Sequence, residues 1–177
     1  GFLFPDTYQF AVTASATQII DAMLQNFDRR VTIEMRQQAL DEGLNLYQAL
    51  TLASIVEREA VLAEERPIIA SVYLNRLRKG IYLESDPTVQ YGKGYDAATG
   101  RWWPHISMGE LRTVDSPYNT YIHPGLPPGP ICSPGLASIQ AVLQPAKTNY
   151  LFFLAKGDGS HVFAETFEEH LQNQAKY

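Results

Sequence analysis

The stretch LYQALTLASIVEREA, residues 46–60, is the most informative of the sequence, because its apolar residues recur at the spacing of a helix that is buried along one face. Asn45 precedes the stretch and is a favourable N-cap residue. At about 100° per residue, four side chains fall within roughly 60° of one another. They are Leu46, Leu50, Ala53 and Glu57. The stretch therefore predicts a helix that carries a carboxylate in the middle of its apolar face.

Glu57 is that carboxylate, whereas Glu59 lies about 160° away on an ideal helix, in an arc of polar side chains. Burial raises the pKa of a carboxyl group, and a Glu that stays protonated near neutral pH can act as a general acid. The alternative is a structural ion pair between Glu57 and Arg76 or Arg78 on the next predicted helix. The same pattern assigns Glu59 to the helix surface or to a supporting position behind the site.

Helical and strand signals continue on both sides of this stretch. The expected helices run from Ser15 or Thr17 to about Leu40, from Pro67 to about Arg78, from Ser133–Pro134 through Leu143, and onward from Thr166. The expected strands are Tyr150 to Ala155 and His161 to Ala164, joined by a Gly-rich turn. The sequence therefore predicts an α+β fold, mostly helical with a small antiparallel sheet, in a single domain over residues 1–177.

Residues 86–135 stand out by composition, because they hold 7 of the 12 glycines and 8 of the 11 prolines. A segment so rich in Gly and Pro cannot be mostly regular structure. It also carries many Tyr and Trp side chains, which are scarce in disordered segments. We therefore expect an ordered loop region that forms a binding surface. Trp102 and Trp103 fit such a surface or, equally, a local core beneath the loops.

Charge and cysteine content exclude several classes of function. The net charge is -5, with 14 Lys and Arg against 19 Asp and Glu and no basic block, which argues against a nucleic-acid binder. Cys132 is the single cysteine, so an internal disulfide and a Cys-rich zinc site are excluded. The His residues lack metal-binding spacing, and no run of about 18 apolar residues would span a membrane. The sequence predicts neither a metal site nor a cofactor.

Two further residues are candidates for a site beside Glu57. A glycosidase normally uses a second carboxylate as nucleophile or base, and Asp86, at the start of the loop region, is the best placed one. An Asp before Pro and Thr is also typical of a structural turn. His161, in the second predicted strand, is either a substrate ligand or a packed structural residue.

The chain resembles the YceG-like, MltG-type endolytic murein transglycosylases over almost its whole length. The resemblance rests on long ungapped segments: GFLFPDTY, LTLASIVEREA, ASVYLNRLRKGIYLESDPTVQYG, SPYNTYIHPGLPPGPICSPG and PAKTNYLFFLAKGDGSHVF. It implies cleavage without water of the MurNAc-GlcNAc β-1,4 bond within peptidoglycan glycan strands, which leaves 1,6-anhydro-MurNAc ends. The implied catalytic acid is the Glu of the SIVE segment, which falls on Glu57 here.

The implied reaction requires one carboxyl group and no cofactor. The C6 hydroxyl of the substrate attacks intramolecularly, at high effective concentration. One Glu can therefore protonate the leaving oxygen and then remove the C6 hydroxyl proton. We expect the glycan groove to be lined by residues of the third helix and of the loop region. They are Asn75, Asp86, Thr88, Gln90, Tyr118, Asn119, Thr120 and the backbone from Gly125 to Gly129.

The resemblance also bears on partners and location. Full-length members resemble proteins with an N-terminal transmembrane helix and a small LysM-like domain. The chain is therefore expected to be the catalytic part of a longer protein anchored at the extracytoplasmic face of the bacterial membrane. Its expected partners are peptidoglycan strands, with peptidoglycan synthases as further candidates, and the family is associated with ending glycan polymerisation. Two alternatives stay open, a hydrolytic muramidase and a peptidoglycan-binding domain without activity.

Overall fold

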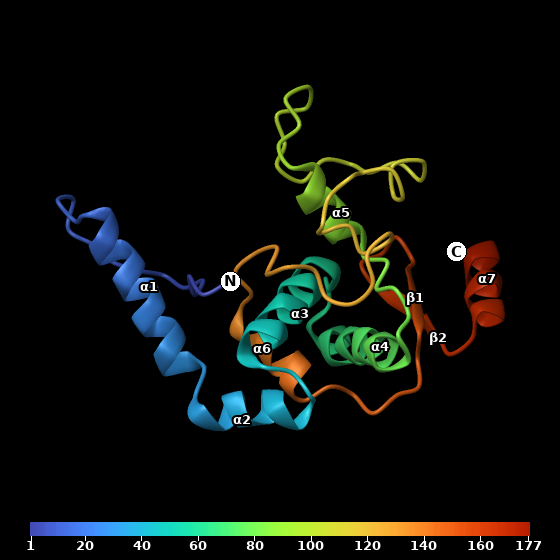
Figure 1. The fold of residues 1–177 in the computed structure, drawn as a ribbon, viewed down its shortest axis with the longest axis horizontal. Coiled ribbons are helices and arrows are strands. Elements are labelled where there is room, and N and C mark those ends of the chain that lie inside the picture. The colour runs from blue at the N-terminus through green and yellow to red at the C-terminus, as the bar shows by residue number, and fades with distance from the viewer.

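Helix α3 (Leu46–Glu59) runs through the centre of the fold in the computed structural model, which describes all of residues 1–177 (Figure 1). Asn45 and Gln48 exchange side-chain to main-chain hydrogen bonds, and this capping box starts the helix. Every residue from 49 to 56 is buried. The predicted helix is confirmed, but it is buried on all sides in this part and not along one face only.

Helices α4 (Arg66–Lys79) and α6 (Leu136–Leu143) pack against α3 and form the core with it. Leu50 of α3, Ile69 of α4 and Ile139 of α6 belong to one buried cluster. Burying aliphatic side chains of this size stabilises the fold by about 1.5–3 kcal/mol each. None of the helices combines the length and the apolar character that crossing a membrane requires.

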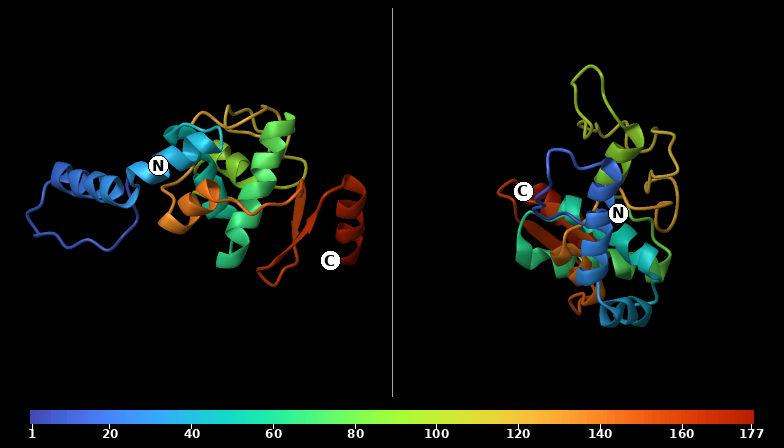
Figure 2. Two further views of the ribbon diagram at one scale, coloured as in Figure 1. Left: turned by 90° about the horizontal axis from the view of Figure 1, so that it is seen from below. Right: turned by 90° about the vertical axis from the view of Figure 1, so that its left-hand side faces the viewer.

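Helices α1 (Ala16–Arg30) and α2 (Ile33–Asp41) replace the single long helix that was expected in this region. The chain breaks between them because the Thr32 hydroxyl accepts a hydrogen bond from the Met35 N–H and caps α2. Val31, just before this cap, is fully buried in the core. The prediction of one helix is therefore wrong, and α1 stands off to one side of the body (Figure 1, Figure 2).

Strands β1 (Phe152–Ala155) and β2 (His161–Ala164) form an antiparallel hairpin in which Phe153 pairs with Phe163. Helix α7 (Phe167–Lys176) packs against the hairpin. Figure 2 shows the hairpin and α7 at the end of the molecule opposite α1. These elements confirm the predicted hairpin and terminal helix. Together with the helical core they confirm the α+β fold class.

Residues 86–135 contain one helix, α5 (Asp86–Lys93), and are otherwise built from turns and loops, as predicted. Pro87 lies in the first turn of α5, where its missing N–H has no helical partner to lose. In Figure 1 the first loop after α5 extends above the helical core, and the following loop extends to the side of α5. Gly135 is the N-cap of α6, so the predicted helix start at residues 133–134 lies too early.

Candidate active site

A cavity of about 440 Å³ lies where the end of α3 meets α4, the start of α5, the hairpin and α7. Its wall mixes apolar side chains with titratable ones. The titratable ones are Glu59, Tyr73, Arg76, Glu84, Asp86, Tyr121, His161 and His170. A concave site in which a few polar groups converge among apolar walls is typical of a ligand pocket. This cavity is therefore the leading candidate for an active site.

Glu59, the last residue of α3, places its carboxylate in this cavity. Its Oε1 accepts hydrogen bonds from the hydroxyls of Tyr73 and Ser85, each at 2.7 Å. Burial raises the pKa of Glu59, and the charge of Asp86 adds to this, against the lowering effects of the two hydrogen bonds and of His161. The other oxygen, Oε2, has no hydrogen-bond partner in the protein and is not buried, so it is open to the cavity.

The expectation that Glu59 lies on the solvated surface of α3 is therefore wrong. It assumed that the polar arc of the helix faces water. Thr51 and Ser54 on that arc are at most 1 % exposed. Their hydroxyls instead donate to main-chain carbonyls of α3 itself. Because other elements enclose α3 on this side as well, a carboxylate on its polar arc can face a cavity inside the fold.

Glu57 does not line the cavity. Its Oε2 accepts hydrogen bonds from the Gly135 N–H at 3.1 Å and from the Ser138 hydroxyl at 2.6 Å. The carboxylate thus sits at the N-terminal end of α6, where negative charge is favourable. The alternative of an ion pair is also wrong, because Arg76 and Arg78 pair with other carboxylates. Glu57 joins α3 to α6.

Asp86 is the one predicted groove residue in the cavity wall, and it lies in the first turn of α5. Its Oδ1 accepts a hydrogen bond from the Tyr121 hydroxyl at 2.6 Å. Burial and this bond raise the pKa of Tyr121 well above its ordinary value, so the phenol remains a donor. Asp86 itself is exposed. The cavity therefore holds two carboxyl groups in unlike environments, Glu59 withdrawn from solvent and Asp86 open to it.

Three predicted groove residues lie buried beneath the loops, because Thr88, Asn119 and Thr120 are at most 1 % exposed. The hydroxyls of Thr88 and Thr120 are 2.8 Å apart and hydrogen-bonded. The Asn119 amide donates to the main-chain carbonyls of Leu111 and Val114. Their polar groups are taken up inside the protein, and their role as glycan ligands stays a prediction. They hold the loop region together.

The other predicted groove residues lie outside the cavity. Asn75 donates to two main-chain carbonyls just before β1, and Gln90 donates to one in the loop region. Tyr118 packs against Tyr91, with ring centroids 4.6 Å apart. Gly125 lies in a separate groove between α3 and the Pro-rich loop. In this structure the predicted groove residues therefore do not line one common cavity.

The two tryptophans of the loop region have different environments. Trp102 is 69 % exposed. Trp103 packs against the core, and the Arg58 guanidinium lies 4.1 Å from the centroid of its ring. The local-core alternative therefore holds for Trp103, while Trp102 is open to solvent.

Sequence reasoning missed Tyr73 and assigned Glu59 to a lesser role. A Tyr among the apolar residues of α4 carries no signal that its hydroxyl will meet a carboxylate from another helix. Tyr121 did carry one, because it ends the polar and aromatic cluster SPYNTY. A weaker signal was present for Glu59, since a helix that ends in two nearby Glu residues presents carboxylates on both of its sides.

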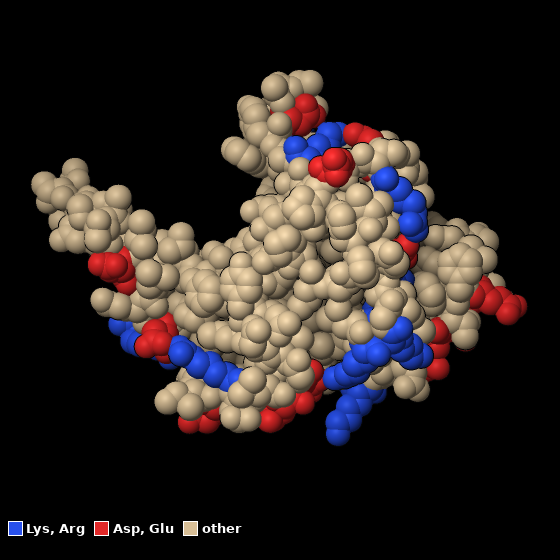
Figure 3. All heavy atoms as spheres, viewed as in Figure 1, with Lys and Arg blue, Asp and Glu red and all other residues tan.

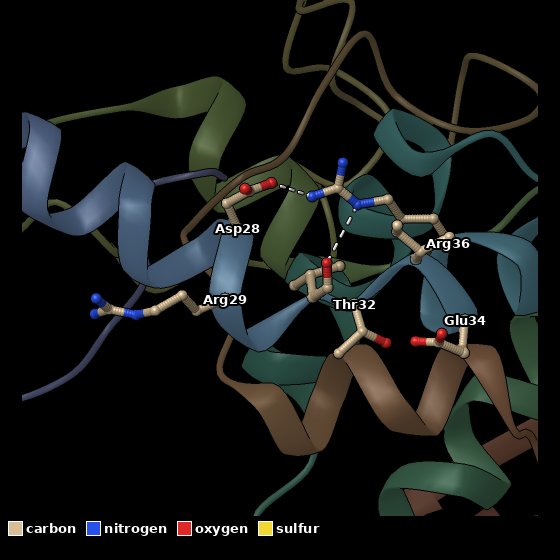
Figure 4. Close-up of a pocket in the computed structure, with 7 residues that line it drawn as sticks. Asp28, Arg29, Thr32, Glu34 and Arg36 are labelled. Atoms are coloured by element: carbon tan, nitrogen blue, oxygen red, sulfur yellow. Dashed lines mark hydrogen bonds and ion pairs between the residues drawn. The ribbon is translucent and has the colours of Figure 1, made fainter.

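A second pocket, of about 460 Å³, lies at the corner between α1 and α2 (Figure 4). Arg36 there donates to the Asp28 carboxylate and to the main-chain carbonyl of Val31. None of the residues predicted as functional lies in this pocket. Its central charges neutralise each other, so the pairing serves to hold the corner between the helices.

Charged side chains lie mainly around the edge of the face shown in Figure 3. The middle of this face is uncharged, and its outline is indented between α1 and the loops above α5. A polyanion would require a positive surface, whereas a neutral ligand does not. The middle of this face lacks the positive surface that a polyanion requires.

The family model and the sequence relatives that match this chain agree with one another. The model of the YceG-like family matches residues 1–176. A protein of Bacillus subtilis named endolytic murein transglycosylase is 40% identical over 178 residues, which are 100% of this chain and 47% of the relative. A Streptococcus pneumoniae protein of the same name is 33% identical over 100% of this chain and 32% of its own length. The chain therefore spans less than half of these relatives.

A solved structure agrees with the sequence relatives. The crystal structure of a yceG-like protein from Listeria monocytogenes has a TM-score of 0.82 and 41% sequence identity to this chain. The match covers 97% of this chain and 53% of the other. Fold and sequence thus lead to the same group of proteins.

Proposed function

The chain belongs to the YceG-like family, and from this membership and the cavity around Glu59 we propose that it cleaves peptidoglycan glycan strands as an endolytic murein transglycosylase. The relatives that carry this name cover the chain from end to end. The cavity supplies what such a reaction needs, a carboxyl group whose pKa is raised by burial and which lies beside an open space. We further propose that the full-length protein acts on the extracytoplasmic side of the membrane and limits the growth of new strands.

The observation that carries the proposal is the environment of Glu59. Tyr73 and Ser85 both donate to Oε1, so the carboxyl group is held in one orientation and Oε2 remains for the substrate. Burial raises the pKa of Glu59, which favours the protonated form that a general acid needs. We therefore assign the acid to Glu59 and not to Glu57, whose carboxylate is engaged by α6.

The proposed reaction uses this one carboxyl group twice. Glu59 donates its proton to the glycosidic oxygen as the bond from C1 of MurNAc to that oxygen breaks. The resulting carboxylate then takes the proton of the C6 hydroxyl as O6 bonds to C1, which closes the 1,6-anhydro ring and restores protonated Glu59. No water is consumed. Attack from within the same sugar is entropically favoured over attack by an external nucleophile.

A hydrolytic muramidase is the second candidate, and one observation favours it. Asp86 shares the cavity with Glu59, and its charge affects the pKa of Glu59. Glycoside hydrolases usually have two carboxyl groups in one site, one as acid and the other as base or nucleophile. Mass spectrometry of digested peptidoglycan separates the candidates, because a lytic product is lighter by one water than the hydrolytic one.

The decisive experiment compares two matched variants, Glu59→Gln and Glu57→Gln, on purified peptidoglycan. Each change removes one carboxyl group of α3 and keeps its size. We expect Glu59→Gln to abolish cleavage and Glu57→Gln to retain it, with anhydro ends in the products. The reverse pattern would return the acid to Glu57. Unchanged cleavage by both variants would exclude α3 as the source of the acid, and absence of cleavage by the unmodified protein would favour a binding domain.

A further inference from the structure

His161 is a cavity residue that the proposed reaction leaves without a role. It opens β2, and its side chain is 6 % exposed. The carboxylate of Glu65, the last residue of η1 (Ala63–Glu65), contacts two nitrogens of His161, one in the main chain and one in the ring. The His161 main-chain N–H donates to Glu65 Oε1 at 3.0 Å, and ring Nδ1 lies 2.7 Å from Glu65 Oε2.

This double contact determines which ring nitrogen is available. A carboxylate accepts hydrogen bonds, so Nδ1 carries the proton and Nε2 is the free nitrogen. Phe153 packs edge-on against the imidazole with ring centroids 5.4 Å apart, which holds the plane of the ring. The side chain therefore has a fixed tautomer and a fixed direction.

Nε2 has no hydrogen-bond partner in the protein. It is also not a buried unpaired atom, because the one such side-chain atom in the chain is Nδ1 of His170. A side chain that is 6 % exposed and lines the cavity thus keeps one polar atom accessible from it. The contacts with Glu65 and Phe153 anchor the ring but leave Nε2 unused.

From this geometry we infer that His161 is a substrate-binding residue whose Nε2 accepts a hydrogen bond from a hydroxyl or acetamido N–H of the sugar beside Glu59. Glu65 is the positioning residue that directs Nε2 into the cavity. The inference rests on the proposed function, because it takes the ligand of the cavity to be a glycan. Sugars offer several such donors, and an imidazole whose Nδ1 is occupied by Glu65 can meet one of them through Nε2.

Two substitutions of His161 separate the proposed Nε2 contact with the sugar from the Nδ1 contact with Glu65. His161→Asn can keep a short donor toward Glu65 but has no atom at the Nε2 position. His161→Gln places an amide near that position and loses the Nδ1 contact. His123→Asn, at an exposed residue outside the cavity, is the matched control. Kinetics on peptide-free glycan strands should show kcat/KM lowered about tenfold for His161→Asn, the effect of losing one hydrogen bond, with partial recovery for His161→Gln. The melting temperature controls for misfolding.

A second measurement does not depend on cleavage. Ring ¹⁵N resonances of His161 are recorded in the Glu59→Gln protein while peptide-free glycan strands are added. We expect the Nε2 resonance to shift and Nδ1 to remain protonated. An unmoved Nε2 resonance, or His161→Asn kinetics within twofold of the unmodified protein, would overturn the inference. Persistent cleavage by Glu59→Gln would instead refute Glu59 as the acid, and absence of cleavage by the unmodified protein would refute the proposed function; in either case the Nε2 resonance would still decide the role of His161.

Discussion

The hydroxyl of Tyr73 donates a 2.7 Å hydrogen bond to Oε1 of Glu59, joining the middle of α4 to the last residue of α3. Tyr73 is 1 % exposed, and its ring packs edge-on against Phe153 of β1. The bond stabilises the charged form of Glu59, whereas burial favours the neutral form. The two effects oppose each other. The pKa of Glu59 therefore depends in part on the hydrogen bond from Tyr73, which a substitution can remove while Glu59 stays in place.

Removing this bond by Tyr73→Phe should move the pH dependence of activity. The charged form of Glu59 loses a donor, so its pKa rises further, and the alkaline limb of the kcat/KM profile should shift to higher pH. The profile is measured on peptide-free glycan strands. Tyr150→Phe is the control, because that hydroxyl has no hydrogen-bond partner in the protein. A limb that stays in place, or moves to lower pH, would contradict the role of Glu59.

Glu59 should also make the fold less stable as the pH rises. Its pKa in the folded state is raised above the ordinary value of 4.5, so the folded chain holds the proton more tightly than the unfolded chain. The stability from the neutral form is fully present below about pH 4.5 and is lost as the pH rises through the folded pKa. Glu59→Gln has no such proton to lose. Its melting temperature should match that of the unmodified protein at low pH and exceed it at alkaline pH, and parallel curves would refute the burial argument.

Local patterns in the sequence predicted the elements better than their surroundings. Helix α3, the β-hairpin and α7 followed from capping residues, apolar spacing and a Gly-rich turn, which act over a few residues. The break between α1 and α2 was missed because Thr32 offers a cap in the middle of a continuous apolar pattern. The choice between α-helix continuation and a new start there depends on where Val31 can be buried, which is a tertiary property.

The site was harder to predict, because the side of a helix on which a residue lies does not reveal which element of the fold covers that side. Glu57 does lie on the side of α3 that the apolar pattern indicated, but α6 covers that side and uses the carboxylate. Glu59 lies on the polar arc, but Tyr73 and Ser85, which reach it from distant parts of the sequence, enclose it. Likewise Thr88 and Asn119 are as polar as glycan ligands need to be, and only the fold shows that they are buried.

Glu57 is expected to matter for stability and not for catalysis. Glu57→Ala leaves the Gly135 N–H and the Ser138 hydroxyl without their charged acceptor. Hydrogen bonds to a charged group contribute about 1.5–3 kcal/mol each, and the hydroxyl can turn to another acceptor, so the free energy of unfolding should fall by about 2 kcal/mol. Urea unfolding measures this, and kcat/KM should stay within about twofold. An unfolded protein would be uninformative for activity, so Glu57→Gln, which keeps an acceptor oxygen, is tested in parallel. Loss of activity in a stable Glu57→Gln protein would contradict the assignment.

The buried pair of Thr88 and Thr120 should contribute to the stability of the loop region. Thr88→Val keeps the shape but removes the bond to the Thr120 hydroxyl and the one to the Ser85 carbonyl. Leaving buried polar groups without partners costs about 1–3 kcal/mol, which urea unfolding would detect. The double variant with Thr120→Val should cost less than the sum of the two single changes, because it removes both hydroxyls of the pair. Strict additivity would show that the two residues do not interact.

Asp86 tests whether the reaction uses one carboxyl group or two. In a hydrolase with Glu59 as acid, Asp86 would be the base or the nucleophile, and Asp86→Asn would lower kcat by about a hundredfold or more. In the lytic reaction the C6 hydroxyl of the sugar replaces that group. The amide oxygen of the variant can still accept from the Tyr121 hydroxyl, so the wall of the cavity is preserved. We therefore expect Asp86→Asn to lower kcat/KM by no more than about tenfold, the scale of one lost contact to substrate. Mass spectrometry should still find one anhydro-MurNAc end for every bond cleaved. A collapse of kcat would assign the second carboxyl group a direct role, and products heavier by one water in the unmodified protein would show a hydrolase.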